Sequence, residues 1–67
     1  MNYSGTYFNY NWELLETEED EKYLLVLIMD DYNSIYITDL YISDEALVNR
    51  ESYVKGGIQR YLTEIQF

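Results

Sequence analysis

The sequence contains no cysteine and no histidine, and only four of its 67 residues are lysine or arginine. Without cysteine, neither a disulfide nor a thiolate-bound metal can stabilise the fold. Without histidine, the chain lacks the commonest zinc ligand and the side chain that most often acts as a base near neutral pH. Because no serine lies in a recognisable nucleophile motif either, we expect a protein that is not an enzyme.

Two short patterns begin like ligand-binding loops, and both are incomplete. The stretch Asp30-Asp31-Tyr32-Asn33 starts like a calcium loop, but the central glycine and the terminal glutamate do not follow at the required spacing. The pair Gly56-Gly57 lacks the flanking pattern and the Lys-Ser/Thr ending of a phosphate loop. We therefore expect no metal and no cofactor.

The length predicts a single domain over residues 1–67. A domain of this size buries only about 60% of its unfolded surface, so small chains without covalent or metal cross-links often gain core by oligomerising. The start of the chain does not have the pattern of a signal peptide. The longest apolar run, Tyr23–Met29, is far shorter than the roughly 20 residues that span a bilayer. We expect a soluble, cytoplasmic protein, in the host bacterial cytoplasm if a phage encodes it.

Negative charge dominates the composition, with thirteen acids against four bases and a formal net charge of −9. Residues 1–49 hold eleven acids and one base, whereas residues 50–67 hold two acids and three bases. The negative field therefore belongs to the first three quarters of the chain. Such a field repels nucleic acid and anionic membranes and attracts basic partners.

Three strands are expected in the acidic part. Residues 1–5 are expected to be a loose start with a turn at Gly5, and residues 6–14 alternate between two faces, as in a half-buried strand. Tyr23–Met29 is apolar on both faces, which favours a central strand buried on both sides. Residues 34–42 alternate again after a polar turn.

A helix is expected after these strands. Ser43 is a suitable N-cap, followed by acids that favour the positive end of the helix dipole. A helical stripe then joins Leu47, Val54, Ile58, Tyr61, Leu62 and Ile65. Gly56-Gly57 leaves two alternatives open, one continuous helix or two helices at 44–50 and 52–65. The predicted fold is α+β, a three-stranded antiparallel meander with a C-terminal helix. Because one helix covers only one face of a sheet, we expect a homodimer to cover the other.

The carboxylates suggest imitation of a nucleic-acid backbone. Alternate residues on a strand are about 6.6 Å apart, close to two phosphate steps of about 3.4 Å on one DNA strand. Solubility alone needs a net charge of only about 2–8 in magnitude for a small domain. The candidate phosphate-mimicking residues are Glu13, Glu16, Glu18, Glu19, Asp20, Glu21, Asp30, Asp31, Asp39, Asp44 and Glu45.

Nine tyrosines provide either core or recognition surface. We expect Tyr10, Tyr23 and Tyr61 in the core. For the candidate partner-binding aromatics, core and surface remain equal alternatives; these are Tyr7, Tyr32 and Tyr36.

The chain resembles small acidic DNA-mimic inhibitors encoded by phages. The shared features are its small size, its lack of cysteine and histidine, its tyrosine content and the acidic run 16–21. The closest in type is a Bacillus phage inhibitor of the histone-like protein HU. The resemblance implies a dimeric, non-enzymatic inhibitor that competes with DNA for a basic protein, with HU as the leading target. The alternative is an adaptor or inhibitor of a replication or transcription enzyme that binds mainly through an apolar, tyrosine-rich patch.

Overall fold

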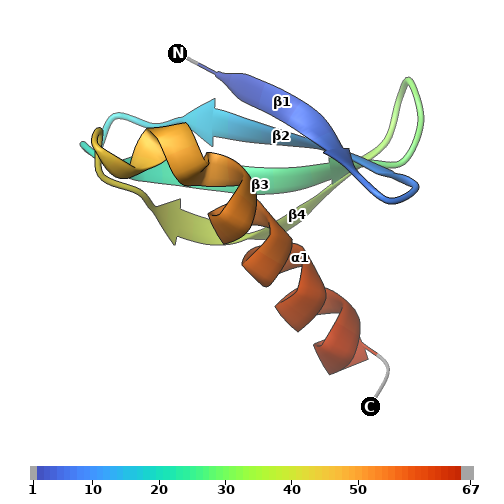
Figure 1. Cartoon of the computed structure of the whole chain (residues 1–67). Helices are drawn as coiled ribbons and strands as arrows, with labels where there is room; N and C mark the ends of the chain where they lie inside the picture. Colours follow the sequence, from blue (N-terminus) through green and yellow to red (C-terminus); the bar gives the residue numbers. More distant parts are fainter. Residues whose placement is uncertain (1, 66–67) are drawn as a thin grey trace.

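The computed structural model describes residues 2–65, which form one antiparallel sheet and one long helix (Figure 1). The strands follow one another across the sheet in chain order. Their bounds are β1 (Tyr3–Tyr7), β2 (Tyr10–Glu16), β3 (Lys22–Ile28) and β4 (Ser34–Tyr41). A short 3₁₀ helix, η1 (Ala46–Asn49), leads into α1 (Arg50–Ile65). The expected α+β class, antiparallel meander and C-terminal helix are confirmed, but the expected number of three strands is wrong because there are four.

The additional strand lies at the start of the chain. Tyr7 pairs with Tyr10 across a tight hairpin, so the expected single strand over 6–14 is divided into β1 and β2. Phe8 begins the turn at a φ of 53°, a conformation that non-glycine residues rarely adopt. Gly5 does not form the expected turn but lies in the middle of β1 opposite Trp12. A Cβ at Gly5 would lie 2.5 Å from Trp12 Cζ2, so the indole occupies the space that a side chain would need.

The core lies between the sheet and the helix. We call this side of the sheet the covered face; its buried side chains alternate along β2 and β3. Ile42, Val54 and Ile58 close the core from the chain segments after the sheet. The buried members on the covered face are Trp12, Leu14, Tyr23, Leu25 and Leu27. Burying each large apolar side chain stabilises the fold by roughly 1.5–3 kcal/mol.

The helix begins later than expected and does not break at the two glycines. Ser43 accepts a hydrogen bond on Oγ from the backbone N–H of Ala46 at 3.2 Å, but the N-cap residue of η1 is Glu45, and α1 starts only at Arg50. The helix then continues through Gly56 and Gly57. A Cβ at Gly57 would lie 3.0 Å from Leu25 Cδ2, so glycine lets the helix approach the sheet closely. Of the residues expected on the helical stripe, the side chain of Ile65 lies outside the described part.

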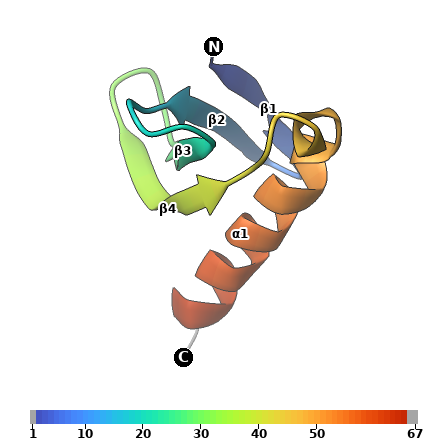
Figure 2. The ribbon, with the colours of Figure 1, turned by 90° about the vertical axis from the view of Figure 1, so that its left-hand side faces the viewer.

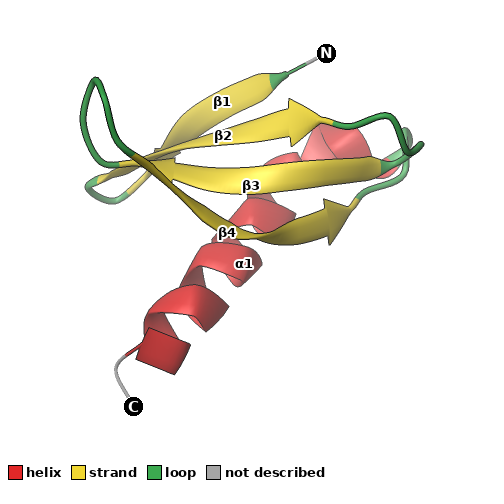
Figure 3. Cartoon of the chain, turned by 180° about the vertical axis from the view of Figure 1, so that it is seen from behind, coloured by secondary structure: helices red, strands yellow, loops and turns green. Residues whose placement is uncertain are grey.

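The helix leaves the other side of the sheet uncovered (Figures 2 and 3). We call this side the open face. Leu24, Val26 and Ile28 of β3 point to it and are half-buried. The expectation that β3 is buried on both sides is therefore wrong for the single chain, since only the covered face is closed. In residues 2–65, no helix has the length and apolar character needed to cross a bilayer.

Candidate functional site

Nine of the eleven predicted carboxylates lie at the two ends of the sheet, because the turns of an antiparallel meander alternate between ends (Figure 1). The β2–β3 turn and the link from β4 to η1 lie at one end, which we call the acidic end. Its carboxylates are Glu16, Glu18, Glu19, Asp20, Glu21, Asp44 and Glu45. The opposite end, which we call the hairpin end, carries the β1–β2 and β3–β4 turns with Asp30 and Asp31. Glu13 and Asp39 lie between the ends on the open face.

Hydrogen bonds to backbone carbonyl groups hold the acidic end together. The N–H of Ile42 donates to the carbonyl of Glu21 at 2.8 Å, which ties the β4 exit to the β2–β3 turn. Thr17 Oγ1 donates to the carbonyl of Lys22 at 2.9 Å and closes the turn from within. Between the two segments is a hollow of about 320 Å³, lined by Glu16, Thr17, Glu19, Asp20, Glu21, Lys22, Tyr23 and Asp44. A lysine or arginine side chain from a partner fits the charge of this hollow.

The charge of the acidic end acts on the groups next to it. Burial raises the pKa of the Tyr23 phenol, and Tyr3 and the carboxylates of Glu16 and Asp44 raise it further. Lys22 Nζ lies 3.6 Å from Asp39 Oδ2 and 3.5 Å from Glu19 Oε2. Asp39 is the largest cause of the raised pKa of the Lys22 ammonium. Lys22 thus forms ion pairs with carboxylates of its own chain.

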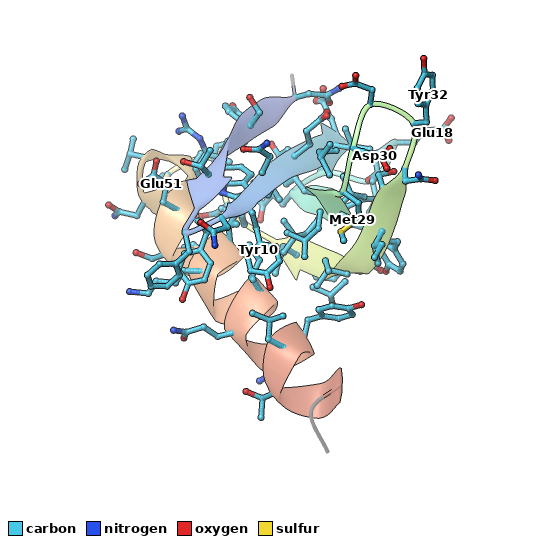
Figure 4. The ribbon with its side chains drawn as sticks, turned by 90° about the vertical axis from the view of Figure 1, so that its right-hand side faces the viewer. Tyr10, Glu18, Met29, Asp30, Tyr32 and Glu51 are labelled. Atoms are coloured by element: carbon cyan, nitrogen blue, oxygen red, sulfur yellow. The ribbon has the colours of Figure 1, made fainter. Side chains whose placement is uncertain are left out.

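The hairpin end combines a structured acidic turn with exposed apolar side chains. Asp30 Oδ1 accepts from the backbone N–H groups of Tyr32 at 2.8 Å and Asn33 at 2.9 Å. Asn33 Nδ2 also donates to both carboxylate oxygens, and this bond is the main cause of the lowered pKa of Asp30. Tyr32 points away from the molecule (Figure 4) and is 95% exposed, and Phe8 on the neighbouring turn is 83% exposed.

The open face carries both charge and aromatic rings. The Tyr36 hydroxyl donates to Asp39 Oδ1 at 2.5 Å, and this bond is the main cause of the raised pKa of Tyr36. Tyr36 and Tyr41 are 56% and 61% exposed. Glu13 lies opposite Val26 on the neighbouring strand. The two acids on this face therefore border an apolar strip.

The aromatic candidates lie in three different places. Tyr32 is at the hairpin end and Tyr36 on the open face, but Tyr7 packs against the core, and its hydroxyl accepts a hydrogen bond from Gln59 Nε2 at 3.0 Å. Of the residues expected in the core, Tyr23 is buried, whereas Tyr10 and Tyr61 are only partly buried and pack against it.

Three exposed aromatic residues of the described chain were not among the sequence candidates: Phe8, Tyr41 and Tyr53, the last of which lies on α1. Tyr41 shares the open face with Lys22, its partner across the β3–β4 pair, and Phe8 occupies a hairpin tip. The alternation of Asp39 and Tyr41 along the last predicted strand was a signal for Tyr41. For Phe8 there was no signal, because the hairpin contains neither glycine nor proline at its tip.

In the described part of the chain, no group of three or more carboxylates is arranged to hold a metal ion. The acidic end is suited instead to an extended cationic surface, because its carboxylates project from two turns into solvent. No family model, no curated protein and no solved structure matches this chain.

Proposed function

We propose that this protein binds a basic nucleic-acid-binding protein and blocks it by placing carboxylates where DNA phosphates would lie. The observation that carries the proposal is the acidic end, where two separate segments bring seven carboxylates together and five of them line one hollow. Carboxylate–lysine and carboxylate–arginine contacts replace those to phosphate, since both anions accept charge-assisted hydrogen bonds from the same donors. The nucleoid protein HU is the leading candidate target.

The number of charges is compatible with this role. The longest dimension of the protein is 32 Å, and a duplex of that length carries about 19 phosphates at one per 1.7 Å. One chain offers eleven candidate carboxylates. Two chains would offer about 22 candidates and a net charge of about −18, twice the −9 of one chain. A homodimer thus matches the charge of the duplex better than a single chain, and we include it in the proposal.

The direct test is a competition between this protein and a labelled DNA duplex for purified HU. We expect the protein to displace the duplex, and its own affinity for HU to fall steeply from about 50 to 500 mM salt, as DNA affinity does. Binding that is unchanged over this range would contradict the proposal. No displacement of DNA from HU, together with displacement from another basic protein, would correct the target but keep the mechanism.

Matched charge-neutralising variants locate the binding surface. Glu18→Gln with Asp20→Asn removes two exposed charges from the acidic end, whereas Glu51→Gln with Glu64→Gln removes two exposed charges from the helix. Both double variants have a net charge two units less negative. We expect the first to weaken binding by about tenfold or more and the second by less than about threefold. Equal losses would indicate attraction by net charge alone.

The alternative function, an adaptor that binds through an apolar aromatic patch, is favoured by the hairpin end. Phe8, Met29 and Tyr32 are all exposed on the two turns there. In such an adaptor, carboxylates only speed association, and aromatic side chains supply the affinity. Tyr32→Ala would then weaken binding more than the acidic-end double variant does.

A further inference from the structure

We infer that the open face is the surface through which two copies of this chain associate, packed sheet against sheet. This inference gives the proposed dimer an interface and does not depend on which basic protein is the target. It follows from three observations, which concern the side-chain pattern of the open face, its charge and its area.

The side-chain pattern separates β3 from the strands before it. An antiparallel sheet with one face in water normally has polar residues on that face. The outward positions of β1 are Ser4 and Thr6, and those of β2 include Asn11 and Glu13. Apart from Lys22 at its start, the outward positions of β3 are apolar, and apolar neighbours on β2 and β4 extend this strip. Its members are Leu15, Leu24, Val26, Ile28, Tyr36 and Tyr41.

The charge of the open face suits a second copy better than a basic partner. Its charged residues are Glu13, Lys22 and Asp39, and the last two already form an ion pair at 3.6 Å. The open face therefore carries a net charge of −1, whereas the whole chain carries −9. A basic protein is attracted to the carboxylates at the ends of the sheet. The nearly neutral strip on the open face is suited instead to an apolar surface, such as the open face of a second copy of this chain.

The area of the open face is in the range that a modest dimer needs. Four strands about 4.8 Å apart and seven residues rising about 3.3 Å each cover about 440 Å² in projection. Protruding side chains add to this projected area, and a standard interface buries roughly 800 Å² per partner. The chain exposes 5070 Å² at a mass of 8.1 kDa, about 570 Å² more than the roughly 4,500 Å² of a compact monomer.

Electrostatics also selects the relative orientation of the two copies. Packed sheets lie about 10 Å apart, within about one Debye length at 0.1 M salt. If like ends were stacked, the seven carboxylates of one acidic end would face the seven of the other. Stacking each acidic end over the hairpin end of the partner reduces this repulsion, because the hairpin end carries only Asp30 and Asp31. The two-fold axis therefore lies between the sheets and crosses the strands.

The test is sedimentation equilibrium on the purified protein, with Val26→Lys and Val48→Lys as a matched pair. Val26 is at the centre of the open face, whereas Val48 is 79% exposed on η1, and both changes add one positive charge. We expect the wild type to pass from 8.1 kDa to about twice that mass by about 100 µM. Higher salt should strengthen the dimer because it screens the repulsion between two chains of −9.

We expect Val26→Lys to raise the dimer dissociation constant by at least about tenfold and Val48→Lys to leave it within about threefold. Circular dichroism checks that both variants fold. A wild type that stays at 8.1 kDa at about 100 µM in about 0.5 M salt would overturn the dimer. A dimer that Val26→Lys does not weaken would overturn the interface alone. The first result would also remove the homodimer from the proposed function, but neither result tests binding to a basic protein, which higher salt should weaken rather than strengthen.

Discussion

The two faces of the sheet are built from the same strands, yet the helix covers only one of them. On the covered face, the helix supplies Val54 and Ile58, and Leu25 is fully buried. On the open face, the next residue along β3, Val26, is half-buried with no helix above it. Both residues are aliphatic, so composition does not explain the difference. A short chain can close one face of a sheet with one helix, and its apolar content exceeds what that face can bury.

The comparison predicts its largest effect for neighbouring truncations on β3. Leu25→Ala should lower the free energy of unfolding by about 2–5 kcal/mol, because it leaves a cavity under the helix. Val26→Ala should cost less than about 1 kcal/mol in the monomer. Urea unfolding at low protein concentration measures both values. If the two costs were equal, the open face would be as well packed as the covered face within one chain.

The next largest effect concerns the fit of β1 against Trp12. Gly5→Ala places a Cβ 2.5 Å from Trp12 Cζ2, so we expect a cost of about 1–3 kcal/mol from overpacking. Ser4→Ala changes the neighbouring residue on the open face and should alter stability by less than about 0.5 kcal/mol. Thermal unfolding measures the stability of the two variants, and the near-ultraviolet circular dichroism of the single tryptophan measures any change in its packing. If Gly5→Ala left the stability unchanged, β1 would be able to move away from Trp12 without loss.

A smaller effect distinguishes the two glycines of α1. Gly56 faces open space, so Gly56→Ala should stabilise the protein by about 0.5–1 kcal/mol through helix propensity. The same change at Gly57 meets Leu25 Cδ2 at 3.0 Å, so we expect it to be about 1 kcal/mol less favourable. Chemical denaturation of the pair measures the difference. Equal gains would show that the helix can move away from the covered face without loss.

The smallest effect is the acid sensitivity of the hairpin end. Hydrogen bonds from Asn33 and from the Tyr32 N–H lower the pKa of Asp30 below its usual 3.8. The Asp30 carboxylate therefore stabilises the turn fully when the pH is above its usual pKa of 3.8. This stabilisation is lost as the pH falls through the lower pKa of the folded state. Amide chemical shifts of Tyr32 and Asn33, followed by NMR between about pH 6 and 2, should report the change. Asp30→Asn should abolish this transition, whereas Asp31→Asn should retain it.

The sequence predicted elements well where apolar periodicity and polar turns coincide. Residues 23–29 and 34–42 were expected as strands and agree with β3 and β4 to within about one residue. The β1–β2 hairpin was missed because Phe8 is not a typical turn residue, no glycine follows Asn9, and alternation continues through the turn. The close fits at Gly5 and Gly57 depend on tertiary contacts, which no local pattern encodes.

The carboxylates themselves were selected from the sequence, but their grouping was not. A phosphate-like spacing of charges along the strands was expected, whereas the structure divides the carboxylates between an acidic end, a hairpin end and the open face. The grouping could have been predicted from the alternation of turns in a meander, because the turn after β2 and the exit from β4 must lie at the same end of the sheet. The expectation based on strand spacing did not take this alternation into account.

The ion pairing of Lys22 has a consequence for chemical labelling. The chain has two lysines, Lys22 on the open face and Lys55 exposed on the helix. Because the pKa of the Lys22 ammonium is raised, Lys22 has less free amine than it otherwise would at mildly alkaline pH, and should react slowly with acylating reagents. A second copy packed on the open face would slow it further, whereas Lys55 would be unaffected. The ratio of the two adducts in a mass spectrum therefore measures association in the unmodified sequence, with Lys55 as the internal standard.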